Sequence, residues 1–136
     1  LAGDIFYDTL MKAYYELDNR YLSINSKSSQ TCGAAVASVL IVGNILYCAN
    51  LGDCRAVLCR NNRAVNLSKD QKASDEAEMH RVMTEGGLIV GGRVAGRLAI
   101  TRAIGDFSLK RELDEHGVLK NKQYLSCIPE IRVTEL

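Results

Sequence analysis

Two short stretches of this chain hold an aspartate in a setting that could support chemistry. Residues 49–57 contain Gly52-Asp53, and residues 92–106 close on Gly105-Asp106, each pair following an apolar, sheet-like run. The end of a strand is where a rigid sheet can present a carboxylate, and a neighbouring glycine lets backbone, metal or water approach closely. Acids brought together in this way could bind or orient a hard divalent cation. Taken alone, Asp53 is more often a turn residue than a ligand, because Gly-Asp is common turn chemistry.

The cysteines and histidines do not form the pattern of a metal–thiolate site. The 5 cysteines are odd in number and include no C-x-x-C pair, and His80 and His116 lie far apart. Zinc sites usually have paired ligands at close spacing. We therefore interpret the cysteines as free thiols in a reducing compartment rather than as metal ligands. Cys48 lies inside a predicted strand, where cysteine behaves as a small hydrophobic residue. We therefore expect a cytoplasmic or nuclear protein.

Helical spacing predicts two helices that would help to position the acids. The first has an apolar face whose tyrosines we interpret as core rather than as a binding surface; its members are Leu10, Ala13, Tyr14, Leu17 and Tyr21. A polar, serine-rich loop is expected over residues 23–30. The second helix begins where Asp75 and Glu78 fit a capping pattern, and Gly86-Gly87 ends it. Its apolar stripe is Met79, Val82 and Met83.

Between the two helices the pattern predicts an antiparallel meander. Strands over residues 34–42 and 45–50 flank the turn Gly43-Asn44, and strands over residues 55–60 and 63–67 flank Asn61-Asn62. The glycine-rich tract over residues 86–92 could cradle a phosphate. It has no Walker lysine and no following helix, so we interpret it as a short strand between turns. With a last strand over residues 131–134, the chain is expected to be α+β.

Composition and charge narrow the class of partner. The chain has 136 residues, 47% hydrophobic and 24% charged, which suits one globular domain. Its net charge of +1 means that the chain lacks the excess of positive charge expected of a nucleic-acid-binding domain. The longest apolar run, over residues 34–42, is too short to span a bilayer, so no membrane partner is expected.

The two aspartate stretches resemble the metal-dependent serine/threonine protein phosphatases of type 2C. The family pattern G-D-S-R-A stands at residues 52–56, with Cys54 for serine, and R-V-x-G-x-L-A-V-S-R-A-I/L-G-D stands at residues 93–106 with two conservative changes. Between them, D-H-K-P stands at residues 70–73 and E-x-x-R-I/V at residues 78–82. The order and spacing of these elements fit the family over nearly the whole chain.

The resemblance implies a fold and a reaction. The family fold is an antiparallel β-sandwich flanked by helices, so we expect that α+β architecture here. At one end of the sandwich, two Mg²⁺ or Mn²⁺ ions hold a water that attacks the phosphorus of phosphoserine or phosphothreonine. The implied cofactors are therefore Mg or Mn, and the implied partners are phosphoprotein substrates.

Residue roles also follow from the resemblance. Asp53 matches the aspartate linked to an additional, weaker metal site, and Asp106 should support the metal centre without binding directly. Asp70, Gln71 and Lys72 begin the flap beside the active site, on the substrate side. The motif arginines, which are Arg55, Arg93 and Arg102, are expected to be mainly structural.

Several family features are absent from this sequence. It has no D-G-H-G motif, no upstream phosphate-gripping arginine and no D-G-I/L-W-D motif. We therefore expect residues 1–136 to be the central part of one type 2C domain, with no catalytic residue of their own and unable to complete a two-metal centre. Gln71 and Ala73 replace the family's histidine and proline. These changes leave two hypotheses: a phosphatase, or a catalytically inactive pseudophosphatase that serves as an interaction module.

Overall fold

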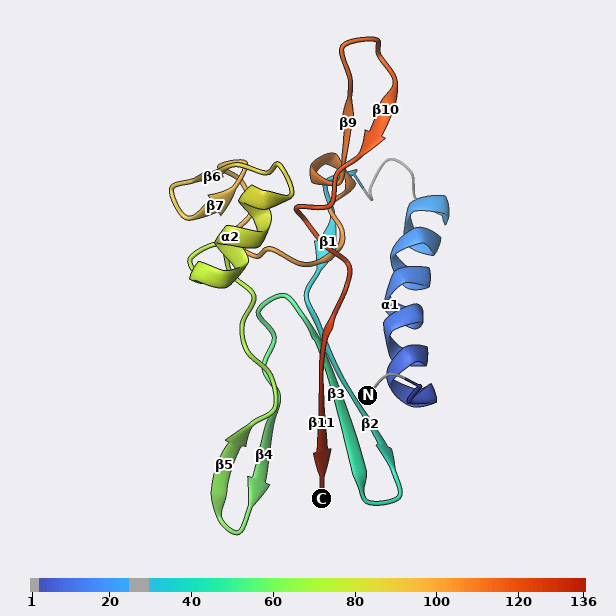
Figure 1. The fold of residues 1–136 in the computed structure, drawn as a ribbon, viewed down its shortest axis with the longest axis vertical. Coiled ribbons are helices and arrows are strands. Elements are labelled where there is room, and N and C mark those ends of the chain that lie inside the picture. The colour runs from blue at the N-terminus through green and yellow to red at the C-terminus, as the bar shows by residue number, and fades with distance from the viewer. Residues whose placement is uncertain (1–2, 25–29) are drawn as a thin grey trace.

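A three-stranded antiparallel sheet forms the centre of the molecule. The computed structural model describes residues 3–24 and 30–136. The strand order is β11 (Glu130–Glu135), β3 (Ile45–Leu51), β2 (Val36–Val42), with β3 in the middle (Figure 1). Because both edges of β3 are paired, it can lie in the interior, and every residue of it after Ile45 is buried.

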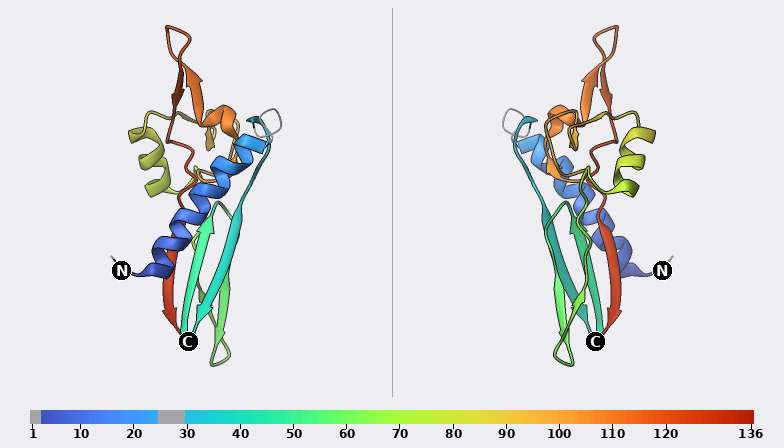
Figure 2. Two further views of the ribbon diagram at one scale, coloured as in Figure 1. Left: turned by 90° about the vertical axis from the view of Figure 1, so that its right-hand side faces the viewer. Right: turned by 90° about the vertical axis from the view of Figure 1, so that its left-hand side faces the viewer.

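Different elements cover the two faces of β3. Helix α1 (Ile5–Ile24) packs on one face, where Tyr14 contacts Ala49 and Leu51. The hairpin of β4 (Val57–Arg60) and β5 (Arg63–Asn66) lies on the opposite face, as the two views in Figure 2 show. There Leu46 and Cys48 pack with Leu67. Successive residues of a strand point to opposite faces, so β3 contributes alternately to the two clusters.

The remaining elements lie at the end of the sheet where β3 finishes (Figure 1). Helix α2 (Glu76–Thr84) packs with the short hairpin of β6 and β7, and a second hairpin of β9 and β10 projects from the body. The bounds of the short elements are β1 (Gly33–Ala34), β6 (Ile89–Val90), β7 (Arg93–Val94), β8 (Ile104–Gly105), η2 (Phe107–Leu109), β9 (Arg111–Leu113) and β10 (Leu119–Asn121).

The α+β class and antiparallel pairing are confirmed. Each pair of named strands is antiparallel. The predicted turn Asn61-Asn62 joins β4 to β5, with φ of 51° and 60°, and Gly43-Asn44 joins β2 to β3. Among the described residues, no helix has the length and hydropathy needed to cross a membrane.

Three details of the predicted elements are wrong. The strand expected over residues 34–42 is interrupted at Ala35, because β1 pairs with β8 whereas β2 pairs with β3. Ser23 and Ile24 belong to α1 rather than to the expected loop, and residues 25–29 lie outside the described part. Leu17 and Met83 were expected on apolar faces but are 50% and 59% exposed, because the elements packed on their helices reach only part of each face.

Candidate functional site

The short segment over residues 33–35 brings the two glycine–aspartate pairs into one region. Gly33 pairs with Gly105, so Asp106 follows directly beside it. Two residues further along, Ala35 lies against Gly52, which precedes Asp53; the carbonyl of Arg102 lies there too. The fold thus brings together two motifs that are about 50 residues apart in sequence, one after β3 and one after β8.

The turn that carries Asp53 is held from its buried side. Gly52 has φ +92° and would place a Cβ 2.8 Å from the Cβ of Ala35, so only glycine fits. The Oε1 of Gln71 accepts a 2.7 Å hydrogen bond from the Gly52 amide, and its Nε2 donates to the Asn50 carbonyl. Asp53 itself is exposed. The turn is therefore fixed while its carboxylate faces solvent.

Asp106 occupies a tighter environment than Asp53. Its backbone is left-handed, with φ +51°, and its amide donates to the carbonyl of Cys32 at 2.9 Å. Its carboxylate lies so close to Gly33 that any Cβ there would overlap it. Burial raises the pKa of Asp106, and the charges of Lys110 and Arg97 oppose that rise. A half-buried carboxylate of this kind is suited to supporting a site rather than meeting solvent.

Asp18 and Lys110 form a buried ion pair that sequence reasoning missed. The Nζ of Lys110 lies 2.8 Å and 2.9 Å from the two carboxylate oxygens of Asp18, and it also donates to the carbonyl of Ala103. Asp18 accepts the Gly105 amide as well, at 2.7 Å. The pair therefore ties α1 to the strand that precedes Asp106. A signal existed: Asp18 lies one helical turn after Tyr14, on the buried face.

The predicted substrate-side residues lie in different environments. Asp70 accepts a two-point contact from Arg55, at 2.7 Å and 3.0 Å, and Lys72 lies 3.0 Å from the same carboxylate. The hydrogen bonds from Arg55 and Lys72 hold the pKa of Asp70 well below its usual range. Gln71 is only 2% exposed and contacts backbone rather than solvent. Its assignment to the substrate side stays a prediction, as do those of Asp70 and Lys72.

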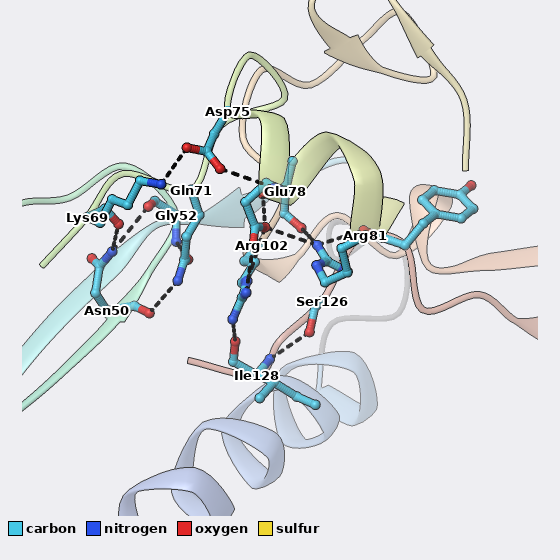
Figure 3. A network of polar contacts seen from close by, with 12 residues as sticks. Asn50, Gly52, Lys69, Gln71, Asp75, Glu78, Arg81, Arg102, Ser126 and Ile128 are labelled. Carbon is cyan, nitrogen blue, oxygen red and sulfur yellow. Dashed lines mark hydrogen bonds and ion pairs between the residues drawn. The ribbon is translucent and has the colours of Figure 1, made fainter. Parts of the chain in front are cut away.

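A buried network joins α2 to residues 101–102, just before β8 (Figure 3). Glu78 lies 2.6 Å from Nη2 of Arg102 and 3.2 Å from Nη2 of Arg81, and it accepts the hydroxyl of Thr101. Burial alone would raise the pKa of Glu78, but hydrogen bonds from Arg102 and Thr101, with both arginine charges, lower it to about 2. The expectation that Arg102 is mainly structural agrees with these contacts.

The predicted capping pattern of α2 is half correct. Asp75 is the N-cap, and its side chain accepts a 3.2 Å hydrogen bond from the Glu78 amide. In a full capping box, the side chain of Glu78 would in turn accept a hydrogen bond from the backbone amide of Asp75. Its carboxylate instead turns inward to the arginines, because two cations and a hydroxyl on neighbouring elements compete better than one amide.

The donor set for a metal ion is incomplete in the described residues. Residues 3–24 and 30–136 contain no group of three or more His, Cys, Asp or Glu side chains close enough to hold a metal ion. Asp53 and Asp106 offer single carboxylates, the oxygen donors that Mg²⁺ and Mn²⁺ prefer. These residues therefore fit part of a metal centre but do not fit a whole one.

Comparison with known proteins agrees with the geometry. The family model for protein phosphatase 2C matches residues 2–136. Protein phosphatase 2C homolog 3 of Schizosaccharomyces pombe is 39% identical over 134 residues, which are 98% of this chain and 31% of that protein. Protein phosphatase 2C 1 of Paramecium tetraurelia is 40% identical over 119 residues, 87% of this chain and 38% of that protein. The chain thus spans less than two fifths of either relative.

Solved structures show the same fold. The structure of a C. elegans sex determining protein superposes with a TM-score of 0.80 at 27% identity, covering 98% of this chain and 31% of that one. A phosphatase from Toxoplasma gondii superposes with a TM-score of 0.68 at 18% identity, covering 96% of this chain and 50% of that one. The second likeness concerns the fold alone.

Proposed function

Because this chain belongs to the protein phosphatase 2C family, we propose that the whole protein hydrolyses phosphoserine and phosphothreonine in protein substrates, using Mg²⁺ or Mn²⁺. The observation that carries the proposal is the meeting of the two glycine–aspartate pairs at residues 33–35. A family match without those acids would support only the fold. Here both motif acids are present and both are positioned by buried contacts.

The two aspartates have different proposed roles. Asp53 is exposed on a turn that is fixed from beneath, so it is the candidate ligand for an additional metal ion. Asp106 is half-buried against Gly33, so it supports the metal centre without direct binding. When bound, the metal ions supply an acidified water as the nucleophile. Since the described residues do not complete that centre, the chain's own contribution is to position these carboxylates.

The surroundings of the site have proposed roles as well. Asp70, Gln71 and Lys72 lie on the substrate side, and the paired charges of Asp70 give this edge a defined shape. Gln71 contributes indirectly, since its side chain holds the turn before Asp53. Phosphoproteins are the proposed substrates. The cysteine pattern supports a cytoplasmic or nuclear location.

The proposal is tested on the whole protein that carries this chain. Turnover of a phosphothreonine peptide is measured with and without Mn²⁺, for the natural sequence, for Asp53→Asn, and for Asp8→Asn as a control on the exposed face of α1. We expect metal-dependent turnover that Asp53→Asn reduces and Asp8→Asn leaves unchanged. Absence of turnover in the folded protein would instead favour the interaction module, whose motivation is the set of substitutions at residues 71 and 73.

A further inference from the structure

An open groove of about 540 Å³ lies beside the Asp53 turn, and its lining includes the substrate-side residues Asp70 and Lys72. It runs between the base of the β4–β5 hairpin and the segment that leads into α2. Its charged lining is Arg55, Lys69, Asp70, Lys72 and Asp75, and its polar lining is Asn66, Ser68 and Ser74. Arg55 is two residues from Asp53, and its pKa is raised mainly by Asp70 and also by the charge of nearby Asp53, so the groove adjoins the proposed site.

The cations of the groove face solvent and its acids do not. The side chains of Arg55, Lys69 and Lys72 are 70%, 66% and 40% exposed, whereas those of Asp70 and Asp75 are 17% and 22% exposed. Three cations against two carboxylates leave a local charge of +1. An approaching ligand therefore meets the positive groups first.

The two acids also have partners within the protein. Asp70 holds Arg55 and Lys72 together, and Asp75 holds Lys69 at 2.6 Å while capping α2. Each of their four carboxylate oxygens therefore already has a partner. Donors remain: within the described residues, Nη1 of Arg55 makes no hydrogen bond, and each ammonium group has further N–H groups. The groove is thus an array of oriented donors with few open acceptors.

We propose that this groove binds acidic residues that flank the phosphorylated residue of a protein substrate. The inference rests on the proposed phosphatase function, since a substrate in the groove must continue to the Asp53 turn. Carboxylates fit the chemistry because Arg55 is held by two points of contact with Asp70, so its guanidinium is already oriented for a second carboxylate. The groove is open to solvent, so it adds selectivity between substrates more than tight binding.

The test compares three phosphothreonine peptides that differ only in their flanks, which are glutamate, alanine or lysine. The quantity measured on the whole protein is the ratio of kcat/KM for the glutamate peptide to that for the alanine peptide. The variant is Lys69→Ala/Lys72→Ala, and its charge-matched control is Lys12→Ala/Lys120→Ala, two exposed lysines on α1 and the β9–β10 hairpin. A Lys69→Arg/Lys72→Arg variant tests rescue by charge.

We expect the glutamate peptide to be preferred by about 10-fold, because each exposed ion pair adds only a modest favourable contribution. The preference should reside in KM and should weaken as salt is raised. It should fall several-fold in the double alanine variant, in which only Arg55 remains of the three cations. The arginine variant and the distant control should keep it. A natural protein without preference, or a double alanine variant that retains it, would overturn the proposal.

A binding measurement separates failure of the groove from failure of the proposed function. Fluorescence anisotropy with the unphosphorylated, glutamate-flanked peptide needs no turnover. One outcome is that the peptide binds to the natural protein and not to the double alanine variant while no peptide is hydrolysed. That result supports binding of acidic residues in the groove and contradicts the proposed phosphatase function. If an oligonucleotide of equal charge binds as tightly and loses affinity equally in that variant, the assignment to a protein substrate is overturned.

Discussion

Replacing Glu78 by glutamine should loosen α2 from residues 101–102, the segment that leads to β8 and Asp106. Glutamine keeps the size of the side chain and can still accept the hydroxyl of Thr101, but it removes the charge that balances Arg102 and Arg81. These guanidinium groups are 17% and 26% exposed, so water cannot fully replace the lost partner. The change therefore leaves partly buried cations unpaired, which is costly.

The magnitude can be worked from the protonation equilibrium. The surrounding cations and hydrogen bonds lower the pKa of Glu78 from 4.5 to about 2. At about 1.4 kcal/mol for each pH unit, this corresponds to about 3 kcal/mol of stabilisation of the charged form. Removing one partner of a buried ion pair typically costs about 3–5 kcal/mol. Both arguments predict that Glu78→Gln lowers the free energy of unfolding by about 3 kcal/mol near pH 7.

The pH dependence provides a second measurement with a definite sign. Because the pKa of Glu78 is lower in the folded protein than its ordinary value of 4.5, this stabilisation is present above pH 4.5 and is lost as the pH falls toward 2. The natural protein should therefore lose about 3 kcal/mol relative to Glu78→Gln across that interval. The difference between the two proteins should be constant above pH 6.

The assay combines urea unfolding of the whole protein with amide hydrogen exchange across α2. A loss of about 3 kcal/mol should speed exchange in α2 by roughly 100-fold, even where global unfolding has several steps. Glu76→Gln is the matched control, because Glu76 lies in the same first turn of the helix but is exposed. If Glu78→Gln behaves like Glu76→Gln, or if its effect does not change between pH 6 and pH 3, the network does not hold α2.

Three further predictions concern the site and the chain. Gly33→Ala should destabilise the protein by about 2 kcal/mol in urea unfolding, because a Cβ at residue 33 overlaps the carboxylate of Asp106; an unchanged free energy of unfolding would contradict this. Gln71→Met should cost about 2 kcal/mol, since the buried Gly52 amide loses its acceptor, and a neutral result in the same assay would refute the role given to Gln71. The 136-residue chain alone should hydrolyse no phosphopeptide and bind Mn²⁺ weakly, because its described residues do not group enough acids; tight binding in calorimetry would refute this.

The features that depend on a few neighbouring residues could be predicted from the sequence. The turn Asn61-Asn62 follows from the tolerance of asparagine for positive φ, and the start of α2 follows from the side chain of Asp75. The burial of Cys48 follows from the apolar run around it. In each case the deciding interactions lie within a few residues, so composition and spacing contain the information.

The sequence by itself therefore determined the α+β class, the local turns and caps, and the motif aspartates with their family resemblance. Only the tertiary structure decided which partners those residues meet. Asp18 and Lys110 are 92 residues apart, and Glu78 and Arg102 are 24 apart. The interruption at Ala35 depends likewise on β8, far along the chain. The physical reason is that burial removes water as a partner, so a charged side chain takes whichever buried group the fold places beside it.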